Sequence, residues 1–147
     1  MTKALLEQFE SATREFCEVA RAIPADKLGV PLGEGEWPPT YVIHHLADSD
    51  AHFLVRFLNV LSTENPTIVP FDEEAFPTAL HYPGRDVEIS LAAIETSLAH
   101  SVDILKQIPD ADWERSGYHP QRGLMTLSDL LALTTGHRLE HIDQLKK

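Results

Sequence analysis

The chain has 147 residues, with 12 lysine and arginine residues against 23 aspartate and glutamate residues, and a formal net charge of −11. A length near the usual size of one domain predicts a single folded unit over residues 1–147. The negative charge disfavours nucleic acid and anionic membrane surfaces as partners, which leaves a small molecule as the expected substrate.

The chain contains one cysteine, Cys17, so an internal disulfide and a cysteine-based zinc site are both excluded. No run of 18 apolar residues occurs, and the first residues lack the apolar core of a signal peptide. We therefore expect a cytoplasmic protein.

Proline clusters mark the first two of four segments patterned as amphipathic helices. The first segment is expected at about residues 2–23, with apolar residues at helical spacing, and it stops before Pro24. The second follows Trp37, since Pro38 or Pro39 can occupy a first helical turn, and continues to about Ser62.

The other two helices are expected in the second half of the chain. One spans roughly residues 89–108 and ends before Pro109. The last begins after Thr126, which forms a candidate capping box with Asp129, and runs to the C-terminus. Four amphipathic helices of about 20 residues predict an all-α protein, a four-helix bundle.

Two connections are long for a bundle, and long connections are often functional. Residues 64–86 carry four prolines, and residues 109–125 carry Trp113, Tyr118 and His119. These aromatic side chains could equally cover one end of the core. Residues 67–69 could pair as a short strand, but no partner is evident, so we predict a loop.

His137 and His141 are four residues apart on the last predicted helix, so both imidazoles can reach one metal ion. Leu130, Thr134 and Leu145 share their face, which places the pair on the buried side of the helix. A single buried histidine is usually hydrogen-bonded within the core. Two on one face favour a metal ion, because it engages lone pairs that are costly to bury unpaired.

A catalytic metal site needs three protein ligands and an open position, so a third ligand must come from another helix. His45 is the best candidate, because it lies early in the second helix and in phase with Val42, Ser49 and His52. His44 is rotated by about 100° from it and would face a neighbour or solvent. The sequence thus predicts a site formed by His45, His137 and His141, open towards the end of the bundle where the long connections gather.

Charged residues near His45 supply candidates for supporting roles. Asp48, Asp50 and Arg56 lie within three turns and could orient an imidazole or bind an anionic substrate group. Each could also belong to a solvated face or a surface ion pair, which is the more common case.

Two other metal patterns fit poorly. The segment from His137 to His141 matches H-x-x-E-H, but only six residues follow, so the downstream ligand of inverted zinc peptidases has no place. Glu140 is kept as a candidate base. Di-iron bundles need glutamate three residues before histidine, which this chain lacks.

Several motifs, in order along nearly the whole chain, resemble the DinB/YfiT-like superfamily. They are HHLADS (residues 44–49) after Trp37-x-x-Thr40, PTIVPFDE (66–73), Tyr118-His119-Pro120, and the terminal Gly136-His-x-x-x-His-Ile142. Members of the YfiT branch are known as metal-dependent hydrolases and bacillithiol S-transferases. The resemblance implies a four-helix bundle, a homodimer, and zinc or nickel bound by His45, His137 and His141.

The resemblance leaves two enzymatic reactions open. A transferase would activate a low-molecular-weight thiol at the metal for attack on an electrophile. A hydrolase would activate water, with Glu140 or Asp48 as proton acceptor. We favour the transferase, because three neutral imidazoles favour an anionic ligand and no base is unambiguous. A non-enzymatic module would instead close the site with a fourth ligand, for which Asp48, His119 and especially His52 are available.

Overall fold

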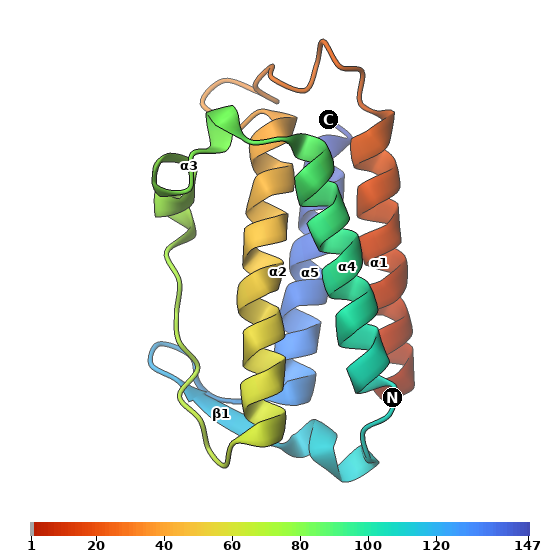
Figure 1. Cartoon of the computed structure of the whole chain (residues 1–147), viewed down its shortest axis with the longest axis vertical. Helices are drawn as coiled ribbons and strands as arrows, with labels where there is room; N and C mark the ends of the chain where they lie inside the picture. Colours follow the sequence, from red (N-terminus) through yellow and green to blue (C-terminus); the bar gives the residue numbers. More distant parts are fainter. Residues whose placement is uncertain (1) are drawn as a thin grey trace.

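Four long helices run along the longest axis of the protein in a computed structural model that describes residues 2–147 (Figure 1). They are α1 (Thr2–Ala22), α2 (Pro39–Ser62), α4 (Val87–Leu105) and α5 (Leu127–Leu145). The predicted four-helix bundle is confirmed. Among the described residues, no helix combines the length and the apolar character needed to cross a bilayer.

Local signals explain where the helices begin. Thr126 and Asp129 form the predicted capping box, with reciprocal hydrogen bonds of 2.9 and 3.0 Å. Helix α4 starts two residues earlier than expected, because the Asp86 carboxylate accepts a hydrogen bond of 2.8 Å from the Glu88 N–H and caps the helix there.

The order of helices around the bundle differs from the order along the chain. Helix α1 packs mainly against α5 and α4, and α2 packs mainly against the same two helices. Helices α1 and α2 therefore stand on opposite corners, and residues 23–38 cross one end of the bundle between them (Figure 1). This arrangement places α2 beside α5.

The first long connection contains three short helical elements, η1 (Glu73–Ala75), α3 (Phe76–Ala79) and η2 (Tyr82–Gly84). From the end of α2 it passes along the outside of the bundle towards the opposite end (Figure 1). This path returns the chain from the C-terminal end of α2 to the end where α4 begins.

The second long connection folds into η3 (Asp110–Glu114) and a hairpin of β1 (Ser116–His119) and β2 (Gly123–Thr126), which was not predicted. The strands pair antiparallel, with Tyr118 opposite Leu124. Thr67 makes an isolated parallel bridge to Tyr118, so the partner that residues 67–69 lacked in the sequence is β1. The segment is otherwise loop, as predicted.

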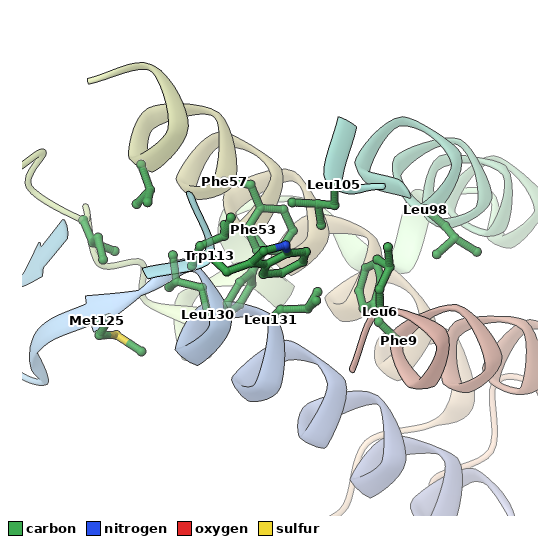
Figure 2. Packing of buried hydrophobic residues seen from close by; sticks show 13 residues of the cluster. Leu6, Phe9, Phe53, Phe57, Leu98, Leu105, Trp113, Met125, Leu130 and Leu131 are labelled. Atoms are coloured by element: carbon green, nitrogen blue, oxygen red, sulfur yellow. The ribbon is translucent and has the colours of Figure 1, made fainter. Parts of the chain in front are cut away.

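Two groups of buried apolar side chains fill the bundle, one towards each end. The group at the hairpin end includes Phe53, Phe57, Leu130, Leu131 and the indole of Trp113, which is 4% exposed (Figure 2). Trp113 therefore closes the core. The other group comes from α1, α2, α4 and the last turns of α5, and its members include the residues next to His45 on α2 and next to His141 on α5.

Candidate metal centre

The imidazoles of His45, His137 and His141 converge on one point between α2 and α5. The ring centroids lie 5.6 Å apart for His45 and His137, 4.9 Å for His45 and His141, and 5.0 Å for His137 and His141. One nitrogen from each ring lies within 4.8 Å of the other two. The structure thus brings together the three residues that the sequence selected.

Local packing holds these rings in place. His137 and His141 project from successive turns of α5. His45 is 1% exposed and has the indole of Trp37 against its ring, with centroids 5.4 Å apart. A fixed ring cannot turn towards water, so its nitrogens must be satisfied within the protein or by a bound group.

The hydrogen bonds of His141 show that the residues fit a metal ion. Its Nδ1 donates to the Gln144 side-chain oxygen at 2.9 Å, so its Nε2 carries a lone pair. That Nε2 is buried, and it has no hydrogen-bond partner in residues 2–147. Histidine ligands usually donate their other ring N–H in this way. Nitrogens of a tetrahedral site lie about 3.4 Å apart, so small side-chain rotations suffice for ligation.

Burial keeps the imidazoles of His45 and His141 neutral. Desolvation, followed by the neighbouring His141 and His137, lowers the pKa of His45 to about 3. Desolvation also lowers the pKa of His141. Metal ligation requires unprotonated imidazole, so at neutral pH no proton has to be displaced from these two rings.

Glu73, which the sequence analysis did not select, approaches the centre from the first long connection. Its carboxylate Oε2 lies 3.1 Å from Nε2 of His45, and its side chain is 42% exposed. It lies on η1, whose first turn is held by a hydrogen bond from the Glu74 N–H to Asp72. An acidic residue in a proline-containing connection could have been noted in the sequence, but only the path of the connection brings it to His45.

The other sequence candidates lie in different environments. Asp48 accepts two hydrogen bonds from Arg85, at 2.7 and 2.9 Å. Glu140 is exposed beside His137. The His52 ring stacks on Phe71 with centroids 4.3 Å apart. Neither Asp48 nor His52 belongs to the group of converging ligand atoms in residues 2–147.

Asp50 and Arg138 form a buried ion pair that links the two helices carrying the histidines. The Arg138 guanidinium donates to Asp50 and also to Thr13 and Thr134. Burial raises the pKa of Asp50, and the adjacent guanidinium opposes that shift. Asp50 lies on α2 and Arg138 follows His137 on α5, so the pair helps to set the separation of the two halves of the site.

A cavity of about 390 Å³ adjoins the histidines, which is near the lower end of the range for small-molecule sites. Both long connections contribute to it, through Phe71 and Glu73 from the first and His119 from the second. His137 and Glu140 line it from α5. A small molecule in this cavity would therefore contact one of the candidate metal ligands.

Fold and site together define a class: helical bundles with three histidines converging beside an open cavity. The family model of the DinB superfamily matches residues 8–145, and the chain belongs to this family. The resemblance noted in the sequence is thereby confirmed.

Two relatives carry the provisional name of metal-dependent hydrolase. YfiT of Bacillus subtilis is 30% identical over 139 residues, 94% of this chain and 76% of that one. A relative from Oceanobacillus iheyensis is 30% identical over 117 residues, 80% of this chain and 67% of that one.

Solved structures agree on the fold. YfiT from Bacillus subtilis, reported to have an unusual four-helix bundle topology, matches with a TM-score of 0.90 at 27% identity, over 99% of this chain and 83% of that one. A mycothiol-dependent maleylpyruvate isomerase matches with a TM-score of 0.80 at 15% identity, over 99% of this chain and 60% of that one. The isomerase shows a shared fold.

Cys17 is buried on α1, and its thiol is expected to be inert in the native protein. Desolvation, followed by the charge of Glu95, raises its pKa to about 11, so the reactive thiolate is scarce at neutral pH. A disulfide reagent such as DTNB at pH 7.5 should leave native protein unmodified over minutes and label one thiol in denaturant. Rapid labelling of native protein at a single site would contradict this assignment.

Proposed function

We propose that this protein is a metal-dependent enzyme acting on a small molecule bound in the cavity beside His137. The convergence of three imidazoles, with the buried Nε2 of His141 among them, carries the proposal. His45, His137 and His141 would hold one divalent ion. When bound, such an ion acts as a Lewis acid and lowers the pKa of a nucleophile. The names of the relatives at 30% identity support the same class.

Glu73 is the residue best placed to accept a proton from the nucleophile. Its carboxylate is within hydrogen-bonding distance of His45 and also lines the cavity. Glu140 lines the same cavity and is the second candidate. Asp48 is engaged by Arg85, so we assign it to a structural pair. A carboxylate so close to the histidines favours water as the nucleophile, and hence hydrolysis.

Thiol transfer is the second candidate reaction, and the absence of negative charge on the three imidazole ligands supports it. Three imidazoles contribute no negative charge, so the ion would keep its full charge and favour an anionic sulfur. The thiol would have to be a separate small molecule, because the chain's one cysteine is buried away from the site. The small thiol belongs to this version of the proposal, whereas zinc or nickel as the ion and the homodimer are proposed for either reaction.

The test is Glu73→Gln, which keeps the shape of the side chain and removes the base. We expect the variant to bind about one metal ion per chain, as the wild type does, while hydrolysis of generic esters and amides falls by about 10²- to 10⁴-fold. Metal content and turnover are measured on the same untagged preparation. Glu140→Gln, on the same cavity, is the matched comparison.

Three outcomes would change the assignment. Loss of metal from Glu73→Gln would make Glu73 a fourth ligand that closes the site, as in a structural metal module. Unchanged hydrolysis would remove Glu73 as the base. Consumption of a small thiol with an electrophile, at equal rates in wild type and Glu73→Gln, would favour thiol transfer.

A further inference from the structure

Three nitrogen-rich side chains, Arg56, His119 and Arg122, line the cavity beside the histidines. Arg56 comes from α2, His119 is the last residue of β1, and Arg122 lies in the turn between β1 and β2. In residues 2–147, neither arginine has a carboxylate within 4.0 Å, although the chain carries a net charge of −11. Two arginines that have no carboxylate partner in the described part of an acidic chain need an explanation.

Arg56 is the more unusual of the two, because it is only 7% exposed. One terminal nitrogen donates to the Val69 carbonyl at 3.1 Å, and the buried Nε has no hydrogen-bond partner among the residues that the structure describes. The guanidinium carbon lies 4.8 and 4.9 Å from the ring centroids of Phe53 and Phe71. The rings hold the planar group but compensate its charge only in part, since a buried cation normally has a paired anion.

His119 adds a donor to the same wall. Its Nδ1 accepts hydrogen bonds from the backbone N–H groups of Gln121 and Arg122, at 3.1 and 3.2 Å. The remaining hydrogen of the neutral ring therefore sits on Nε2, which makes that atom a donor. Burial lowers the pKa of His119, and the nearby charges of Arg56 and Arg122 add to the shift, in keeping with a shared electropositive region.

We propose that Arg56, His119 and Arg122 form a subsite for an oxyanion, a carboxylate or a phosphate, carried by the small molecule in the cavity. A guanidinium presents paired N–H groups that match the two oxygens of such an anion. Glu73 and Glu140 line the cavity with His137, so an anionic group is favoured at the arginines and not beside the glutamates. That this molecule is the substrate rests on the proposed function.

The experiment measures anion binding separately from metal binding. Inorganic phosphate and succinate are titrated into the ¹⁵N-labelled chain, with uncharged succinamide as a control, and dissociation constants are taken from the amide shifts. The titrations are repeated with metal-free His137→Ala, so that an anion cannot bind through the ion. We expect phosphate or succinate to bind in both backgrounds, and the tighter of the two identifies the anionic group.

The variants Arg56→Met and Arg122→Gln should each weaken that binding by about tenfold or more while leaving metal content unchanged. Arg14→Gln is the matched control, because it removes an exposed arginine from α1. Arg122 is exposed in the turn, so its variant keeps the test valid if Arg56→Met does not fold.

The subsite would be overturned if both arginine variants bound the anion as tightly as the wild type does. It would also be overturned if uncharged succinamide bound as tightly as the anion. Anion binding that disappears in His137→Ala would place the anion at the metal and also overturn it. Arginine-dependent binding in a protein that takes up no metal would leave the subsite standing and contradict the proposed function.

Discussion

Replacing His137 by alanine is expected to abolish tight metal binding without unfolding the bundle. His137 lies within 4.8 Å of the candidate ligand atoms of His45 and His141 and is only partly buried, so its removal deletes a ligand while sparing the core. We expect the affinity to fall by more than about 100-fold, which is the upper range for loss of an outer-shell partner alone. Competition with a chromophoric chelator at pH 7 measures the change.

His45→Ala and His141→Ala should give losses of the same order, because each removes one of three ligands. His100→Ala is the matched control, since His100 is exposed on α4. Circular dichroism of every variant should retain the wild-type helix signal. Equal loss of metal in His100→Ala, or wild-type affinity in His137→Ala, would contradict the three-histidine site.

Of all the single substitutions, Asp50→Ala is expected to lower the free energy of unfolding the most. The variant leaves the Arg138 guanidinium buried between α1, α2 and α5, hydrogen-bonded to Thr13 and Thr134 and over the Phe9 ring but with its carboxylate removed. Breaking a buried pair in this way typically costs about 3–5 kcal/mol. Urea unfolding followed by circular dichroism measures the loss. Metal affinity should weaken as well, because the pair links the helices that carry His45 and His137.

The double variant Asp50→Leu/Arg138→Met separates a lost pair from an uncompensated charge. Apolar replacement of both partners is often neutral or stabilising, so the double variant should be more stable than Asp50→Ala. If the double variant were less stable than Asp50→Ala, the packing of the two side chains would contribute more to stability than the compensation of the Arg138 charge. A loss below about 1 kcal/mol in Asp50→Ala would show that Arg138 finds water or another partner.

Features that depend on neighbours along the chain could be read from the sequence. The end of α1 and the start of α2 followed from prolines, and the start of α5 followed from the capping box of Thr126 and Asp129, because these interactions are complete within a few residues. His137 and His141 also converge for a local reason, because residues four apart on a helix lie on the same face. The hairpin of β1 and β2 was missed, because its strands are only four residues each and part of its pairing is with Thr67.

His45 lies beside the pair for a reason that is tertiary. Its position requires α2 to stand beside α5, although these helices are separated by more than 60 residues. Helical phase put His45 on an inward face, and so left His44 facing a different neighbour, Ser90 at 2.8 Å. Helical phase alone does not determine which helix packs against that inward face.

The sequence by itself determined the four helices, the histidine pair and the third histidine as candidate ligand. Only the tertiary structure decided that Arg138 is buried against Asp50, that Glu73 reaches His45, and that Arg56 and Arg122 share a cavity. Each of these contacts joins residues from different elements, and one or both partners lie outside any periodic pattern. The distance between the partners depends on helix packing and on the path of two irregular connections, which local sequence preferences do not specify.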